Sequence, residues 1–399
     1  MPHLPPPRQR RQWLAAVLLA VALGPFLSAQ PRPPDGSPPF DPRGQPNRSR
    51  PGPWDNDALV YRATADGTSE RLTVFPRAGV PTAARLADGR LCIAHQHFPE
   101  DNSADFDKVA VHFSSDEGRT WTAPTVIRVR GLPEGMRFPF DPTLVPLPDG
   151  HVRLYFTSHQ GRRIQDDRPA IYSAISRDAV EFTFEPGVRF GIVGRFVIDC
   201  AVGLHRGVFH LFAPDNGAGP PPGSPNPGMP PAAERPQPGT GYHATSTDGL
   251  NFTRQPDVHI AGRRNWLGNV QSDGDLLRFF GSGGPGGPGP GDRGPGNPGG
   301  PRRPPGEPGD RGPGNRTGPG RPPGEPGNPP RPGGPGGIWV ATSPDGAAWT
   351  LQEKFASVPG ADPGAVALQD GSWLVVVTSP PRPGTPSAQR RGGPEDRRP

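Results

Sequence analysis

The sequence predicts an all-β fold, a β-propeller of four-stranded blades, and two sets of repeated segments support this prediction. The first set places Ser, Asp, often Gly, then an aromatic residue and Thr at nearly fixed offsets. Its four copies are SSDEGRTWT (114–122), SRDAVEFT (176–183), STDGLNFT (246–253) and SPDGAAWT (343–350). Similar units repeated every few tens of residues are typical of arrays, and units built of short strands indicate a propeller.

The second set consists of hairpins, each a short apolar strand, a turn with Gly and a second strand. The five copies span 79–95, 141–158, 199–214, 267–282 and 362–379. A degenerate Ser-x-Asp unit at 59–75 precedes the first hairpin. We therefore expect five blades over 58–379, with six as the alternative count. The N-terminal pair of strands would complete the last blade and close the ring.

The remaining segments have the composition of signals and linkers. Residues 1–29 combine arginines, an apolar run and a small-residue cleavage site, which predicts a cleaved signal peptide. The protein would be secreted or periplasmic, without stable membrane insertion. Pro-rich and Gly-rich composition predicts disorder in a linker, two insertions and a tail. These are 30–57, 213–240, 283–337 (which interrupts the approach to the fifth blade) and 380–399.

The formal net charge of +5 comes from outside the predicted domain. The signal holds three arginines and the tail five against two acids, which leaves −1 for the rest. We therefore expect no nucleic-acid partner, and a monomer. Cys92 and Cys200 lie in apolar strand-like runs, where a buried free thiol is the common state, although export would permit a disulfide. They lack the His partners of a zinc site, so we expect no metal and no cofactor.

Candidate catalytic residues stand where the first strand of each hairpin begins. These positions hold Asp141, Asp199 and Asp362 in three blades, and Val80 and Gly268-Asn269 in the other two. If the strands converge on a common axis, the three carboxylates would shift one another's pKa values, which is one way to build an acid and a base. Alternatively, each Asp starts a strand or caps a turn, as Asp-Pro often does.

Arginines recur shortly before these strand starts. They are Arg77, Arg137, Arg195 and Arg264. Because a guanidinium suits bidentate capture of a carboxylate, sulfate or phosphate, these residues predict the binding of an acidic glycan. Pairing with a neighbouring aspartate is the alternative.

The segment Ser114–Trp121 resembles the Asp-box (BNR repeat) of the sialidase-like propellers, whose members include exo-alpha-sialidases. The resemblance implies that the repeated turns are structural and remote from the ligand. It also implies a general acid in the loop 95–111, on Asp105 or secondarily Asp107, and gives Arg77 the place of the family's first substrate-binding arginine. The loop acids could instead be solvated or bind calcium.

The chain also departs from that family. Arg77 precedes Ala-Gly-Val-Pro in place of Ile-Pro, five blades are expected instead of six, and no tyrosine stands at the axis to serve as nucleophile. The set Asp141, Asp199 and Asp362 also resembles the axial acids of five-bladed furanosidase-like glycosidases. Three functions therefore stay open: a sialidase-like hydrolase or binder of acidic glycans, a neutral-sugar glycosidase, and a non-catalytic propeller that binds glycans or proteins.

Overall fold

The structure is a computed structural model that describes residues 53–161, 168–217, 239–260, 265–283 and 337–379. The predicted signal peptide, most of the linker, the tail and the interiors of both insertions lie outside the described residues. No described helix is long and apolar enough to span a membrane. A single turn of 3-10 helix, η1 (Pro53–Asp55), precedes the strands.

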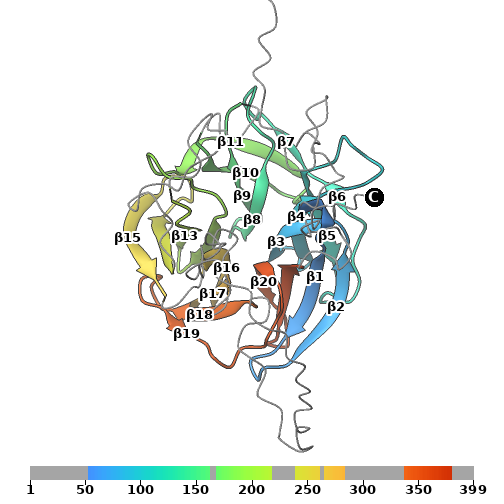
Figure 1. Cartoon of the computed structure of the whole chain (residues 1–399), viewed down its shortest axis with the longest axis vertical. Helices are drawn as coiled ribbons and strands as arrows, with labels where there is room; N and C mark the ends of the chain where they lie inside the picture. Colours follow the sequence, from blue (N-terminus) through green and yellow to red (C-terminus); the bar gives the residue numbers. More distant parts are fainter. Residues whose placement is uncertain (1–52, 162–167, 218–238, 261–264, 284–336, 380–399) are drawn as a thin grey trace, which may run out of the picture. The chain divides into compact units, whose positions relative to one another are not determined.

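The described chain is an all-β propeller of five blades, as predicted (Figure 1). Blade 1 contains β3 (Ala78–Arg85), β4 (Leu91–His97), β5 (Lys108–Ser114) and β6 (Thr125–Val126). Blade 2 contains β8 (Phe140–Pro146), β9 (Val152–Ser158), β10 (Ala170–Ser176) and β11 (Glu181–Phe190). Blade 3 contains β12 (Ala201–His205), β13 (Val208–Pro214), β14 (Thr240–Ser246) and β15 (Thr253–His259). Blade 4 contains β16 (Asn265–Asp273), β17 (Leu276–Ser282), β18 (Trp339–Ser343) and β19 (Thr350–Leu351).

Blade 5 closes the ring by joining the two ends of the propeller. It contains β20 (Ala361–Ala367) and β21 (Trp373–Thr378), followed in the sheet by β1 (Ala58–Ala63) and β2 (Ser69–Phe75). Strand β1 pairs with β21 in antiparallel register from Ala58↔Thr378 to Ala63↔Trp373. The predicted completion of the last blade by the N-terminal strands is therefore confirmed.

Two features of the blades differ from the sequence prediction. Blade 2 carries a fifth strand, β7 (Arg128–Arg130), which pairs in parallel with β11. Its three residues are too few for their alternation to predict a strand. The insertion 283–337 was assigned to the approach to the fifth blade, but it lies between β17 and β18, which pair within blade 4. Its flanks are cross-strand neighbours there, because Gly281 pairs with Trp339.

The innermost strands of the blades surround the axis. Around the ring, β3 contacts β8, β8 contacts β12, β12 contacts β16, β16 contacts β20 and β20 contacts β3. Apolar side chains fill the space between neighbouring blades. Between blades 3 and 4, for example, the fully buried Trp266 packs against Phe212, Phe279 and Trp339. Burial of this aromatic surface contributes about 25 cal/mol per Å² and holds the inner strands in a fixed ring.

The four repeated Ser-x-Asp segments are tight turns between the third and fourth strands of blades 1 to 4. In blade 1, the Ser114 hydroxyl donates to Asp116 at 2.8 Å, and Asp116 accepts the backbone N–H of Thr120 at 2.9 Å. The same Ser–Asp hydrogen bond recurs at Asp178, Asp248 and Asp345. Bonds from Thr120 and Ser114 lower the pKa of Asp116 to about 2. These turns organise the backbone of the blades, in agreement with the structural role expected of them.

Candidate active site

The five innermost strands begin with the same backbone irregularity. A residue with positive φ stands at each start: Val80 (48°), Asp141 (50°), Asp199 (59°), Gly268 (157°) and Asp362 (49°). In four blades the strand register also shifts at this point, as in a β-bulge. A left-handed backbone is uncommon for residues other than Gly, above all for β-branched Val. Strain repeated at one structural position is typical of a functional site.

These positions meet in a small axial cavity, so the predicted convergence of the three carboxylates is found in the structure. The cavity has a volume of about 20 Å³ and is lined by Asp141, Asp199 and Asp362 together with Val80, Gly268 and Cys200 among others. This is room for about one water molecule. A larger ligand would have to sit at the mouth, above the carboxyl groups.

The Asp141 and Asp199 carboxyl groups form a hydrogen-bonded pair across the boundary between blades 2 and 3. Burial raises the pKa of both groups, and the negative charge of Asp362 raises each further. Because two carboxylates this close cannot both ionise easily, the negative charge of Asp141 also raises the pKa of Asp199. Burial also raises the pKa of Asp362, to about 6. The cavity therefore combines three carboxyl groups whose pKa values are all raised.

Three buried hydroxyl groups fix the positive-φ residues, and sequence reasoning did not find them. Thr157 accepts the backbone N–H of Asp199 at 3.1 Å, Ser282 accepts that of Asp362 at 2.7 Å, and Thr378 accepts that of Val80 at 2.9 Å. We call these contacts the hydroxyl clips. Each joins the end of the second strand of one blade to the first strand of the next. The signal is the Ser or Thr that ends the second strand of these hairpins.

The three predicted arginines that the structure describes lie outside the lining of the axial cavity and contact loop acids. Arg77 pairs with Glu100, and its Nη1 donates to the Trp54 carbonyl at 2.9 Å. Arg137 pairs with Asp107, and its guanidinium lies 5.3 Å from the ring centre of Phe140. Arg195 lies 3.8 Å from Asp215, whose carboxylate accepts the Tyr242 hydroxyl at 2.6 Å. Arg264 lies outside the described residues.

The loop acids Asp105 and Asp107 occupy different environments. Asp105 accepts from the Asn102 side chain at 2.6 Å, and its charge acts on His97 and Lys108. Asp107 accepts from Gln96 at 2.9 Å and from Arg137, and its negative charge contributes to the raised pKa of Asp141. Of the two, Asp107 is thus electrostatically linked to the axial carboxyl groups. Neither residue lines the axial cavity.

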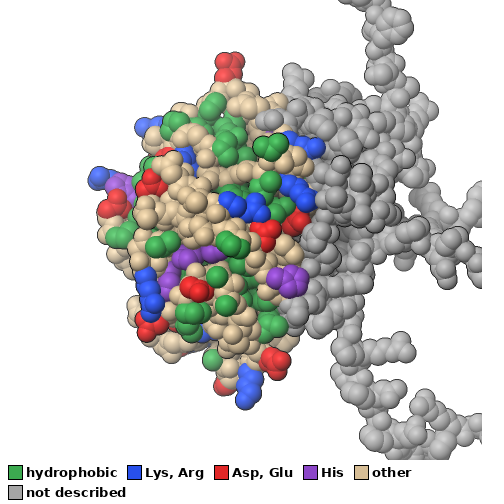
Figure 2. All heavy atoms as spheres, turned by 90° about the vertical axis from the view of Figure 1, so that its left-hand side faces the viewer, with side chains coloured by type: hydrophobic (Ala, Val, Ile, Leu, Met, Phe, Trp, Pro, Cys, Tyr) green, Lys and Arg blue, Asp and Glu red, His purple; other side chains and the backbone are tan. Residues whose placement is uncertain are grey.

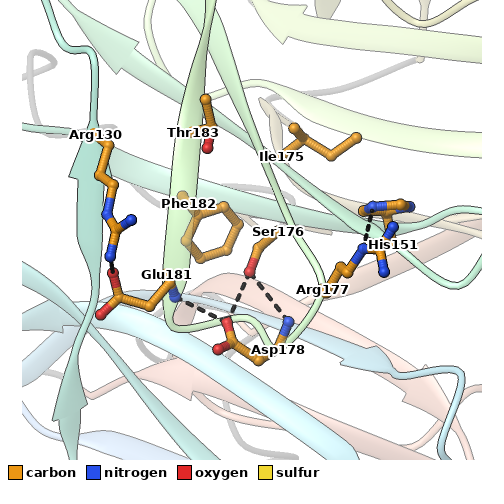
Figure 3. A pocket seen from close by; sticks show the side chains of 9 residues that line it. All are labelled: Arg130, His151, Ile175, Ser176, Arg177, Asp178, Glu181, Phe182 and Thr183. Carbon is orange, nitrogen blue, oxygen red and sulfur yellow. Dashed lines mark hydrogen bonds and ion pairs between the residues drawn. The ribbon is translucent and has the colours of Figure 1, made fainter.

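A larger hollow of about 360 Å³ lies at the repeated turn of blade 2 (Figure 3). Its charged groups contact one another: Arg130 pairs with Glu181, and Arg177 donates to His151 at 3.1 Å. Asp178 accepts the N–H groups of Val180 and Glu181. These polar groups of the hollow therefore already have partners within or beside the turn. We therefore place the candidate active site in the smaller axial cavity, where three carboxyl groups meet.

In the described part of the chain, no three His, Cys, Asp or Glu side chains are arranged to hold a metal ion. Cys92 and Cys200 are buried free thiols, and burial raises their pKa far above the ordinary value. Figure 2 shows the outer surface on the side of β13 and β15, where basic and acidic side chains are interspersed.

Comparisons with known proteins found solved structures of similar fold. No family model and no curated protein matches the sequence. A beta-fructofuranosidase of Bombyx mori is 12% identical, with a TM-score of 0.45 over 82% of this chain and 58% of that one. An alpha-L-arabinofuranosidase of Clostridium thermocellum is 12% identical, with a TM-score of 0.43 over 75% of this chain and 80% of that one. A Hadza microbial sialidase is 13% identical, with a TM-score of 0.38 over 71% of this chain and 47% of that one. This chain therefore spans less than two thirds of the Bombyx mori enzyme, and none of these likenesses assigns it an activity.

Proposed function

We propose that the protein hydrolyses glycosidic bonds at the mouth of the axial cavity. The observation that carries this proposal is the placement of an adjacent carboxyl pair with raised pKa values, Asp141 and Asp199, in one cavity with the carboxyl group of Asp362. Glycoside hydrolysis needs one carboxyl group to protonate the leaving oxygen and another to activate water or attack carbon. Buried groups with separated pKa values suit these two tasks.

The hydrogen bond between Asp141 and Asp199 limits how the roles can be divided. Carboxyl groups that flank a scissile bond lie about 5–5.5 Å or 6.5–9.5 Å apart, whereas hydrogen-bonded oxygens lie within about 3 Å. The pair therefore acts as one partner, the general acid, and Asp362 is the other. In this scheme the pair donates its proton to the leaving oxygen as the glycosidic C–O bond breaks. The attacking water forms the new C–O bond and gives its proton to Asp362. Before the next cycle Asp362 releases this proton to solvent and the pair takes up one proton from solvent.

For the substrate we propose a glycan with an acidic group, bound by Arg137. Its partner Asp107 acts electrostatically on Asp141, which associates this arginine with the axial site. The side chains of Arg137 and Asp107 are 37% and 26% exposed, and ion pairs of this kind contribute only about 0–1 kcal/mol. An incoming carboxylate or sulfate can therefore take the place of Asp107 at small cost.

The test is a panel of chromogenic glycosides, neutral and acidic, with the wild type and three variants. Asp141→Asn and Asp362→Asn should each reduce kcat by at least about 100-fold, since acid–base groups contribute that much. Arg137→Ala should raise KM for acidic substrates at least about tenfold and leave neutral ones unchanged. Arg90→Ala, which changes an arginine paired with Asp88 on an outer turn, is the control. Turnover that survives both aspartate variants would overturn the proposal.

A further inference from the structure

Lys108 and Arg137 bring two positive charges together where β5 of blade 1 begins and the chain enters β8 of blade 2. The Lys108 ammonium lies over the ring of Phe138, 4.2 Å from the ring centre. The Arg137 guanidinium pairs with Asp107. Each cation thus contacts the direct chain neighbour of the other cation. These two contacts hold the basic side chains in one cluster, and we call Lys108 and Arg137 the basic pair.

The two members of the basic pair differ in their partners. Arg137 has Asp107, whereas Lys108 makes no ion pair with the residues that the structure describes. The Lys108 side chain is half-buried, and its ammonium has three N–H donors. Burial lowers the pKa of Lys108, and the charge of Arg137 lowers it further, against the opposite effect of nearby acids. An anion beside this ammonium would therefore be bound favourably.

Phe138 gives the ammonium a fixed support. Its ring packs against the hydrophobic core formed by blades 1 and 2. A cation over an aromatic face is attracted by the electrons of the ring. The Lys108 side chain is therefore held in place before a ligand arrives, which reduces the entropy lost on binding.

Asp107 is the internal partner that an incoming anion has to replace. One of its carboxylate oxygens accepts from Gln96 at 2.9 Å, and the other accepts from Arg137. Its backbone N–H donates to the carbonyl of His97 at 2.8 Å. The contacts with Gln96 and His97 keep Asp107 anchored when Arg137 exchanges its partner. The exchange costs little, because ion pairs as exposed as this one are weak.

We propose that the basic pair binds a sulfate ester group of the substrate, with Lys108 as a second anchor beside Arg137. The inference rests on the proposed function, because it names the acidic group for which that function provides a single arginine. A planar guanidinium engages two oxygens of an anion, and a compact ammonium engages one more. A sulfate ester offers three terminal oxygens, whereas a carboxylate offers two. The sulfate ester is therefore the better match to the basic pair.

The test uses chemical labelling, because Lys108 and Lys354 are the two lysines of the chain. The intact wild-type protein is acetylated with limiting acetic anhydride in sodium sulfate or in sodium chloride of equal ionic strength. Peptide mass spectrometry then gives the acetylation of each lysine. Sulfate should protect Lys108 in a saturable way and leave the exposed Lys354 unchanged. A galactose sulfate monoester should protect Lys108 as well, and galactose should not.

Three variants show which charges hold the anion. Arg137→Ala should raise the half-protecting sulfate concentration by about tenfold or more, since hydrogen bonds to charged groups are strong. Asp107→Asn should lower it by about two- to fivefold, because the competing charge is removed while an acceptor for Gln96 remains. Asp101→Asn removes an exposed charge from the same loop and should leave this concentration unchanged.

Two results with the wild-type protein alone would overturn the inference. One is a Lys108 that acetic anhydride does not label, and the other is a Lys108 that sulfate protects no better than chloride does. Protection by inorganic sulfate without protection by galactose sulfate would overturn the assignment to a sulfate ester. An Asp107→Asn protein that binds sulfate no more tightly than Asp101→Asn would also contradict the exchange of partners.

The labelling needs no turnover, so its result is independent of the proposed function. A protein that hydrolyses no glycoside would refute the proposed hydrolysis and still yield the protection of Lys108. Hydrolysis of glycosides by a protein whose Lys108 is not protected would refute the basic pair alone.

Discussion

The Asp141 and Asp199 carboxyl groups hydrogen bond to each other although the two residues begin the innermost strands of different blades. Each stands at a left-handed backbone position, with φ of 50° and 59°. Only 8% of Asp141 is exposed. Burial of two adjacent acids costs folding free energy. We therefore expect this pair to lower the stability of the protein in exchange for a role in activity.

Replacement of Asp141 by Asn should therefore stabilise the protein at alkaline pH. The folded-state pKa of Asp141 is raised by burial, so its contribution to stability is present below the unfolded pKa of about 3.9 and is lost as pH rises through the folded value. Asn has nearly the same shape as Asp and can still hydrogen bond to Asp199. At pH 8 we expect Asp141→Asn to raise the free energy of unfolding by about 1–3 kcal/mol, measured by urea denaturation.

The gain should vanish near pH 4, where the wild-type carboxyl group is protonated as well. Asp101→Asn, in an exposed loop, is the control and should change the unfolding free energy at neither pH. A variant less stable than the wild type at pH 8 would contradict the assignment of a buried, charge-repelling pair.

The pH dependence of hydrolysis should be bell-shaped. Burial raises the pKa of Asp362 to about 6, so activity should increase through pH 6 as this carboxyl group ionises. Activity should then fall at higher pH as the Asp141–Asp199 pair loses its proton. The measurement is kcat/KM against pH on a glycoside that the protein hydrolyses. Thr378→Val should move the ascending limb to higher pH, and an ascending limb that does not move would argue against Asp362 as the base.

The start of β16 should not accept a side chain at Gly268. A Cβ there would lie 1.9 Å from the carbonyl oxygen of Phe280, in a backbone with φ of 157°. At Gly79, next to the corresponding position of blade 1, a Cβ would lie 3.7 Å from Thr378, which is ordinary contact. We expect Gly268→Ala to lower the free energy of unfolding by about 3 kcal/mol or more and Gly79→Ala by less than about 1 kcal/mol. Equal losses of stability in the two variants would contradict the close approach of Gly268 to the Phe280 carbonyl.

Buried histidines should make the propeller sensitive to acid. Burial lowers the pKa of His243 to about 4, and its ring stacks on Phe212 at 4.6 Å and hydrogen bonds to His210 at 3.2 Å. Because the folded pKa lies below the unfolded value of about 6.5, the unfolded state binds the extra proton, and stability falls as pH drops from 6.5 toward 4.

The variant His243→Phe should reduce this dependence. Its free energy of unfolding should fall less steeply between pH 6.5 and 4.5 than that of the wild type, by up to about 1.4 kcal/mol per pH unit. The difference between the two proteins isolates this histidine from Asp141, Asp199 and Asp362, whose raised pKa values make stability rise as pH drops. His259, which is exposed, provides the control His259→Gln. Parallel curves for His243→Phe and the wild type would contradict the prediction.

Much of the fold was predictable because propeller blades are local structures. Each hairpin pairs residues that are close in sequence, and each Ser-x-Asp turn forms its hydrogen bonds within a few residues, as from Ser114 to Thr120. The closure of blade 5 followed from counting these units. Strand β7 was not predicted, because it exists only through its pairing with β11.

The site was predictable in part. Asp141, Asp199 and Asp362 were identified from their common place in the hairpin repeat, and the fold brings them to one cavity. The arginines shared a spacing as well, but spacing could not reveal that Arg77, Arg137 and Arg195 would contact Glu100, Asp107 and Asp215. Those partners come from loops whose paths depend on the packing around them.

By itself, the sequence determined that this chain forms a five-bladed propeller with an aspartate at three strand starts, because repeat spacing and alternation encode local pairing. The tertiary structure alone decided that two of those aspartates lie together as a pair, that Thr157 and Thr378 accept the backbone N–H groups of Asp199 and Val80, and that the cavity has room for about one water. Those properties depend on distances across blade boundaries. Such distances are set by how the sheets pack around the ring, and no pattern along a single blade records them.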